Sequence, residues 1–224
     1  MYHDVHNFCA VDLGSFYLDV IKDRLYCDAP DSFSRRAAQT VICEILLGLV
    51  RLIAPVMVHT AEEAWQHIPS ELRDDASVHL GEWPEVDENV LDAELEEKWA
   101  AFMTIRREVA KALEIARVEK VIGSSNDAAV TLYPDEELRQ LLAQFEVPEL
   151  EALFIVSQVH IGKEGDAVSR DAWEGLEGRL KVLVHSPEGA KCERCWRYSS
   201  FVGTSEGHPG LCQRCHEVVV GSMS

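Results

Sequence analysis

Positive charge is scarce in this 224-residue sequence. It has 21 Lys and Arg against 39 Asp and Glu, which gives a formal net charge of -18. A surface with that balance repels phosphate, which argues against a general nucleic-acid-binding protein and against attachment to anionic membranes. Contact with nucleic acid would therefore require basic side chains to be concentrated in one place.

Recognisable catalytic motifs are also missing. The sequence contains no Gly-rich phosphate loop, no HExxH segment and no nucleophile elbow. The tetrad at 160–163 resembles the HIGH signature of ATP-adenylating enzymes, but it lacks the second histidine and ends a late predicted strand instead of opening a helix. We predict no catalytic residue in this chain.

No apolar run is both long and free of polar residues. The nearest candidate, residues 37–58, contains Gln39, Glu44, Arg51 and Pro55, so it indicates a buried core helix and not a membrane span. No basic and apolar signal peptide opens the sequence. Together with the unpaired thiols described next, this predicts a cytoplasmic protein with no membrane partner.

The seven cysteines divide unevenly. Three lie in apolar helical surroundings, and the other four form a C-x2-C, sixteen residues, C-x2-C pattern at Cys192, Cys195, Cys212 and Cys215. That spacing favours one Zn²⁺ bound by four thiolates, which leaves no open position for catalysis, so we predict a structural ion. The alternatives are two disulfides, a redox pair, or replacement of one thiolate by His208 or His216.

The first 122 residues carry helical periodicity. Helices are predicted at about 5–26, 33–53 and 90–121, with a capping box at 60–63 that would start a short helix. The second of these is apolar nearly all round, which is typical of the middle of a bundle. The predicted fold is therefore mainly α: an antiparallel helical bundle over 1–122.

The pattern changes after residue 122. Strands are predicted at 128–133, 153–161 and 180–185, with a short helix at 135–145. These elements define a small α+β junction module over 123–187. A four-cysteine zinc ribbon follows over 188–218, and 219–224 is predicted to be a flexible tail.

Basic residues gather locally in spite of the overall charge. Residues 181–224 hold five Lys and Arg against four Asp and Glu, and Trp196 beside the first cysteine pair could either stack on unpaired bases or pack over the ribbon. The long helix carries a basic run that would either follow an RNA backbone or form a solvated face of local ion pairs. The candidate RNA-binding residues are Arg35, Arg36, Arg106, Arg107, Lys111, Arg117, Lys120, Arg194, Trp196, Arg197 and Arg214.

Several segments together resemble a known family. They include His6-Asn7-Phe8-Cys9, the stretches 13–19 and 21–26, Ser34–Thr40, Leu52–Pro55, Thr60–Trp65, Arg106–Val109, Ile122–Ser125, Phe154–Ser157 and Lys191–Trp196. In this order they are similar to the C-terminal anticodon-binding region and zinc ribbon of bacterial isoleucyl-tRNA synthetases, which are class I aminoacyl-tRNA synthetases. The ribbon after an α+β junction separates this type from the valyl, leucyl and methionyl enzymes.

The resemblance implies a function for each part. The bundle would grip the anticodon stem of isoleucine tRNA, and the junction and ribbon would reach the anticodon loop. The nucleotide-binding fold that uses ATP, the KMSKS loop and the editing domain of the family are not in this sequence. We therefore expect a chain that is inactive alone and that works as part of a monomeric isoleucine–tRNA ligase. The alternative is a helical protein-interaction module capped by a structural zinc ribbon.

Overall fold

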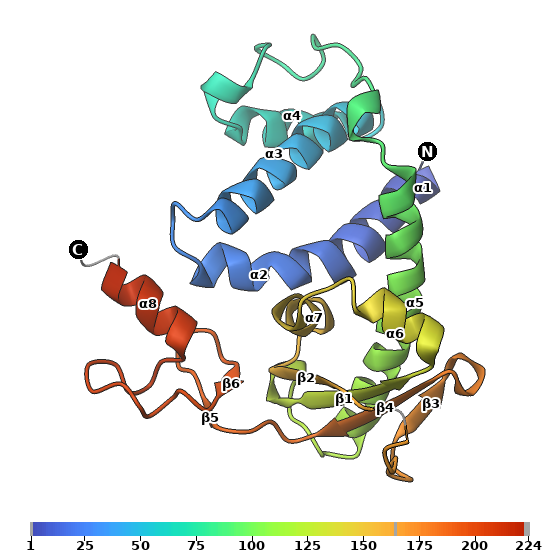
Figure 1. Ribbon diagram of the computed structural model, residues 1–224. Coiled ribbons are helices and arrows are strands. Elements are labelled where there is room, and N and C mark those ends of the chain that lie inside the picture. Colours follow the sequence, from blue (N-terminus) through green and yellow to red (C-terminus); the bar gives the residue numbers. More distant parts are fainter. Residues whose placement is uncertain (1, 164, 222–224) are drawn as a thin grey trace. The chain divides into compact units, whose positions relative to one another are not determined.

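The computed structural model describes residues 2–163 and 165–221, and the chain divides into two compact units. Unit 1 comprises Met1–Ala29 and Ala93–Ser224, and unit 2 comprises Pro30–Asp92. About half of the described chain is helical, and it also carries a small sheet (Figure 1). None of the helices in the described ranges has the length and apolarity that crossing a membrane would require.

Unit 2 is helical. It contains α3 (Phe33–Ile53), α4 (Val58–His67), and the 3₁₀ turns η2 (Ser70–Leu72) and η3 (Glu88–Val90). Helix α3 has the predicted bounds: the Ser32 hydroxyl caps it by accepting the Arg35 N–H at 3.2 Å, and Pro55 follows its end. The buried residues of α3 are Ala38 and Val50, so its remaining apolar side chains are at most partly covered.

One prediction in unit 2 is wrong. Helix α4 begins at Val58, so Thr60 does not open it. The Glu62 carboxylate instead accepts hydrogen bonds from the Ser77 hydroxyl at 2.7 Å and the Val78 amide at 3.2 Å, and so fixes the loop after α4. Trp83, which would have been a second candidate anchor for that loop, is 55% exposed. The buried aromatic of this unit is Trp65.

Unit 1 begins with helical backbone from Tyr2 to Cys27. It consists of α1 (Tyr2–Asn7), the π-helical segment η1 (Phe8–Tyr17) and α2 (Leu18–Cys27). The long helix α5 (Ala93–Val118) buries Phe102, Ile105, Val109 and Leu113 on one stripe, as its periodicity predicted. It ends where Lys120 adopts a left-handed conformation and the Val121 N–H bonds to the Ala116 carbonyl at 2.9 Å.

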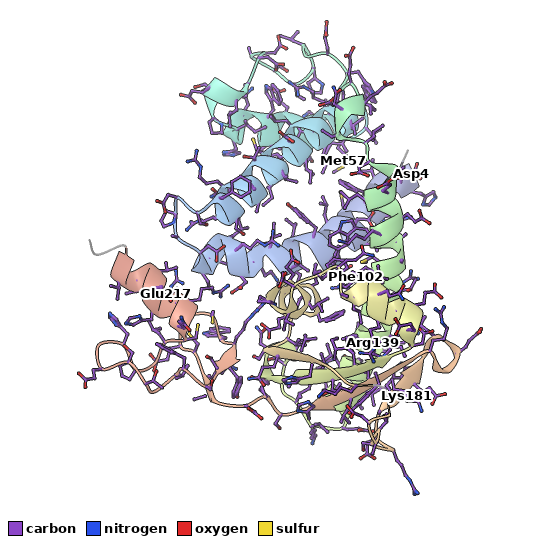
Figure 2. All side chains as sticks on the ribbon, viewed as in Figure 1. Asp4, Met57, Phe102, Arg139, Lys181 and Glu217 are labelled. Atoms are coloured by element: carbon purple, nitrogen blue, oxygen red, sulfur yellow. The ribbon has the colours of Figure 1, made fainter. Side chains whose placement is uncertain are left out.

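A four-stranded sheet forms the other half of the core of unit 1. Its order is β2-β1-β4-β3, with β1 parallel to β2 and antiparallel to β4. Helices α5, α6 and α7 pack against it, and Phe102, labelled in Figure 2, lies in this core. The bounds are η4 (Ser125–Asp127), β1 (Ala129–Pro134), α6 (Glu136–Leu142), α7 (Val147–Phe154), β2 (Gln158–Ile161), β3 (Trp173–Gly175), η5 (Leu176–Gly178) and β4 (Leu180–His185).

The C-terminal ribbon completes unit 1. It contains the two-stranded pair β5 (Ala190–Lys191) and β6 (Tyr198–Ser199) and the helix α8 (Gln213–Gly221). Figure 1 shows the ribbon and α8 beside the C-terminal end of α2. Residues 219–221, predicted to belong to a flexible tail, are helical, whereas 222–224 lie outside the described residues.

One strand prediction was only partly right. The segment 153–161 was expected to be a single strand, but its first residues end α7 and only Gln158–Ile161 are extended. Ile155, between them, adopts a left-handed backbone with φ 59°. The Val156 N–H closes the helix end on the Glu151 carbonyl at 3.0 Å.

Candidate zinc centre and nucleic-acid interface

The four ribbon cysteines converge on one point. The Sγ atoms of Cys192, Cys195, Cys212 and Cys215 all lie within 4.8 Å of one another, and Cys195 Sγ is 3.7 Å from Cys212 Sγ. A tetrahedral site with Zn–S bonds of about 2.3 Å has sulfur–sulfur edges of about 3.8 Å, so the donor set fits this ion. Figure 2 shows sulfur atoms gathered beside the start of α8. Neither His208 nor His216 belongs to the cluster; their rings contact each other at 5.8 Å.

Donors from the protein surround the sulfurs. The Cys212 amide donates to Cys192 Sγ at 3.3 Å, and Arg194 Nη1 lies 3.6 Å from Cys215 Sγ. Hydrogen bonds from Cys195 and Cys212 lower the pKa of the Cys215 thiol, whereas the hydrogen bond with Cys212 raises the pKa of the Cys195 thiol. A thiolate is the form that binds metal, and the amide and guanidinium donors would stabilise thiolates around an ion. With four thiolates the ion would have no open position for substrate or water.

Two adjoining cavities lie in unit 1, and the second of them borders the ribbon. The first has a volume of about 200 Å³ and is lined by α2, α5 and the end of α7. The second has a volume of about 420 Å³ and is lined by α2, η4, the end of α7 and the first cysteine pair. Asp19 and Ile155 line both cavities. The two cavities therefore share part of their walls, and we call them together the α2 groove.

The α2 groove collects five of the eleven candidate residues. Arg106 and Arg117 line the first cavity, and Arg194, Trp196 and Arg197 line the second. The Trp196 side chain is 62% exposed, so it does not serve as the core of the ribbon. Basic and aromatic groups thus face one hollow even though the whole chain is strongly acidic.

Arg106 and Arg117 differ in how readily their guanidinium groups could bind a phosphate. Arg106 Nε donates to the Leu153 carbonyl at 3.2 Å, and its guanidinium lies 4.6 Å from the centroid of the Phe16 ring. Burial lowers the pKa of Arg106, although Asp19 opposes this change. Arg117 pairs with Glu114 at 2.7 Å on the exposed face of α5. An exposed local pair of this kind is weak and can exchange its carboxylate for a phosphate.

The other candidates lie elsewhere. Arg35 and Arg36 belong to unit 2, and Lys120 lies at the turn after α5. Lys111 binds the Glu108 carboxylate at 2.8 Å, and Arg107 donates to the Met103 carbonyl of its own helix at 3.1 Å. Arg214 donates to Asp23. Burial opposes ionisation of Asp23, yet the hydrogen bond from Arg214 prevails and lowers the pKa of that carboxyl.

Sequence reasoning missed three residues of the groove. Lys22 and Tyr26 of α2 and Asn126 of η4 line its second cavity. Tyr26 is 74% exposed at the end of its helix. The first two lie within the stretch 21–26 that carries the resemblance, so a signal was present, but only the structure brings them to the ribbon.

Comparisons with known proteins agree with this geometry. The family model described as the anticodon-binding domain of tRNA ligase matches residues 1–132, and the zinc finger found in FPG and IleRS matches residues 189–218. The isoleucine–tRNA ligase of Moorella thermoacetica is 48% identical over 222 residues, which is 98% of this chain and 24% of that protein. Those of Shouchella clausii and Syntrophotalea carbinolica are 47% and 48% identical, each over 98% of this chain and 23% of its own length.

The chain thus spans about a quarter of the length of the curated relatives it matches. The first family model covers more than half of the chain, with all of unit 2 and part of unit 1, while the second covers the four-cysteine cluster. The sequence predicted this order of parts: helices first, then a small sheet, then a zinc ribbon. This chain belongs to the family of anticodon-binding domains of tRNA ligases, and it carries the structural zinc finger found in isoleucyl-tRNA synthetases.

Proposed function

We propose that this chain recognises the anticodon arm of an isoleucine tRNA, as the C-terminal part of an isoleucine–tRNA ligase. The observation that carries the proposal is the α2 groove. Its second cavity has two exposed aromatic side chains, Tyr26 and Trp196, together with Lys22, an exposed cation that pairs with Asp19 at 2.6 Å. Proteins usually read single-stranded RNA loops with aromatic side chains, on which unstacked bases stack, and with neighbouring cations, which bind the phosphates.

The chemistry assigns different roles along the groove. Trp196 and Tyr26 would stack on loop bases, while Lys22 and Arg117 would neutralise phosphates. Arg106 is half-buried and bonded to a carbonyl, so it would shape the wall more than bind phosphate. The RNA contacts of four further candidates, Arg35, Arg36, Arg107 and Lys120, stay predictions. Because the rest of the surface is acidic, binding by the isolated chain would be weak and strongly dependent on salt.

Zinc would act through structure. It would be held by Cys192, Cys195, Cys212 and Cys215 and would supply folding free energy to a segment with little core of its own. Amino-acid activation with ATP would belong to the rest of the enzyme. We therefore infer that this chain alone does not adenylate isoleucine, and that the enzyme works as a cytoplasmic monomer.

We also infer the domain organisation that the sequence predicted. A bundle over 1–122 would be followed by a junction over 123–187 and a ribbon over 188–218. The packing of α3 against α4 in unit 2, where Val50 and Trp65 share one apolar cluster, supports the bundle, because pairs of packed helices are its building blocks. Limited proteolysis of the whole chain tests this division: first cuts near residues 122 and 187 support it, and first cuts inside the bundle or the junction would contradict it.

The function is tested with zinc-loaded protein and a labelled isoleucine-tRNA anticodon stem-loop at two salt concentrations. A stem-loop with altered loop bases is the control for RNA, and Phe33→Ala, an exposed aromatic of unit 2, is the control for protein. We expect preference for the cognate loop and losses of about 1–3 kcal/mol in binding free energy for Trp196→Ala and for Tyr26→Ala. Equal binding of both loops at low salt, or unchanged binding by both variants, would contradict the proposal.

A further inference from the structure

Both cysteine pairs of the ribbon carry an arginine in the same position. The sequences Cys192-Glu193-Arg194-Cys195 and Cys212-Gln213-Arg214-Cys215 each place it directly before the second cysteine. The two loops that would enclose the metal therefore present two guanidinium groups from equivalent places. Neither group is a metal ligand, and both reach the last turns of α2.

Arg194 binds the end of that helix. Its Nη1 donates to the Cys27 carbonyl at 2.5 Å, and its Nη2 donates to the Tyr26 carbonyl at 3.3 Å. The last carbonyls of an α-helix have no partner within the helix, and a cation at that end also interacts favourably with the helix dipole. Arg194 thus caps α2 from a segment more than 160 residues later in the chain.

Arg214 binds the same helix one turn earlier. Its Nη1 and Nη2 donate to the two carboxylate oxygens of Asp23 at 2.5 and 2.7 Å. A two-pronged pair of this type fixes orientation as well as distance. The Asp23 side chain is only 18% exposed, and Arg197 adds a longer ion pair to it at 3.8 Å. Solvent therefore screens this carboxylate less than it screens a surface pair.

We propose that Arg194 and Arg214 are positioning residues that dock the zinc ribbon onto the last turns of α2, Arg194 through the carbonyls at the end of the helix and Arg214 through Asp23. Docking in this way keeps Trp196 on the same cavity as Tyr26. The two arginines were candidates for contact with RNA, but their terminal N–H groups serve protein acceptors. The docking itself is independent of the proposed function; only its consequence for RNA binding rests on that function.

The docking is tested first without RNA, by hydrogen exchange of the backbone amides in β5 and β6 in zinc-loaded protein. The variants are Asp23→Asn, Arg214→Gln and the double variant. Each single change should speed exchange at least about tenfold, the effect of losing one charged hydrogen bond, while zinc content stays at one ion per chain. The double variant should add little to either single one, because both remove the same pair.

Arg179→Gln is the matched control. Arg179 forms a comparable two-pronged contact within unit 1, with Asp135 at 2.7 Å and Glu137 at 2.6 Å, but it does not touch the ribbon. It should leave ribbon exchange unchanged. Unchanged exchange in Asp23→Asn and Arg214→Gln, or additive effects in the double variant, would overturn the docking proposal whatever the RNA results are.

Binding measurements with the stem-loop RNA distinguish a positioning residue from one that contacts phosphate. Loss of a phosphate contact reduces the slope of log affinity against log salt by about one. Arg117→Gln should show that change, whereas Arg214→Gln should weaken binding several-fold at every salt concentration with the slope retained. A reduced slope for Arg214→Gln would contradict its positioning role. If the ribbon docks as proposed but the wild-type chain shows no preference for the cognate loop, the proposed function fails and the docking stands.

Discussion

At the scale of single residues, Trp196 combines an unfavourable backbone with an exposed ring. Its φ is 65°, and its side chain is 62% exposed. The left-handed region costs a residue with a β-carbon about 1–2 kcal/mol. Two hydrogen bonds of 2.9 Å impose this conformation, from the Trp196 N–H to the Cys192 carbonyl and from the Cys192 N–H to the Arg197 carbonyl. Glycine would suit the backbone better, so the indole at this place points to a role outside folding.

One substitution at this position should therefore change the stability of the ribbon and the affinity for RNA in opposite directions. Trp196→Gly should leave zinc affinity intact or raise the stability of the ribbon by about 1 kcal/mol, because the left-handed strain is relieved. The same change should weaken stem-loop binding by about 1–3 kcal/mol, because a stacking surface is lost. Chelator competition measures the first quantity and fluorescence anisotropy the second. Loss of zinc from Trp196→Gly would mean that the indole supports the ribbon after all.

Residues differ in how far the sequence predicts their role. The spacing of Cys192, Cys195, Cys212 and Cys215 identifies a metal site because the requirement is local: each pair needs two intervening residues. The partnership of Tyr26 with Trp196 depends on a fold that joins segments about 170 residues apart. No pattern within either segment contains that information, so Tyr26 was missed. For the same reason the contact of Arg214 with Asp23 was not predicted, while its contact with RNA stays an untested prediction.

At the scale of elements, a buried carboxylate fastens β3 to α5. Glu108 accepts hydrogen bonds from Trp173 Nε1 at 2.9 Å and from Lys111 Nζ at 2.8 Å. Gly175 makes room for it, since a β-carbon there would lie 2.5 Å from Glu108 Oε2. The hydrogen bond from Lys111, followed by that from Trp173, lowers the pKa of Glu108 below its ordinary value of 4.5.

The sign of this shift fixes a pH dependence. Because the pKa is lower in the folded state, Glu108 stabilises the fold above pH 4.5, and this contribution is lost as the pH falls through the folded pKa. Glu108→Gln should cost about 1–3 kcal/mol of unfolding free energy at pH 7 and flatten the loss of stability below pH 4.5. Urea unfolding followed by tryptophan fluorescence from pH 7 to pH 3 measures both. Parallel pH curves for the variant and the wild type would refute the assignment.

Elements were predicted best where one pattern dominated. The strand at 180–185 and the helix at 33–53 have the predicted bounds, since alternation marked the strand, and Ser32 and Pro55 marked the two ends of the helix. The prediction of one strand over 153–161 was wrong for its first residues, because in the sequence an apolar run at the end of a helix has the same pattern as a buried strand. The signals for α7 were Pro148 in its first turn and the pair Glu146 and Glu149 as its capping box. The π-helical conformation of η1 has no sequence signal that we can name.

At the scale of the whole molecule, the metal should control a small part of the fold. The sheet and helices of unit 1 share a continuous apolar core, which contains no residue of the ribbon. The ribbon has short strands and one nine-residue helix, α8, so most of its ordering depends on the four thiolates and on its contacts with α2. Core and ribbon therefore have separate sources of stability.

Removal of zinc should then have a local effect. A strong chelator, or Cys192→Ser, should make the ribbon sensitive to protease near residues 186–190, while the far-ultraviolet circular dichroism of the remaining helices changes little. The midpoint of urea unfolding for the core should stay within about 1 kcal/mol of the wild type, because no core side chain is altered. Cys43→Ser, which changes a thiol of unit 2, is the control. Cooperative loss of all helical signal on chelation would contradict this separation.

The connection between sheet and ribbon is short. Only residues 186–189 separate β4 from β5, and Gln158 holds the backbone of Glu188 with hydrogen bonds of 2.9 and 3.0 Å. Four extended residues reach about 14 Å at most. A ribbon released from α2 would therefore stay tethered at an effective concentration in the millimolar range. Its return would be an intramolecular step, independent of protein concentration, so the rate of re-docking after zinc is restored should not change on dilution.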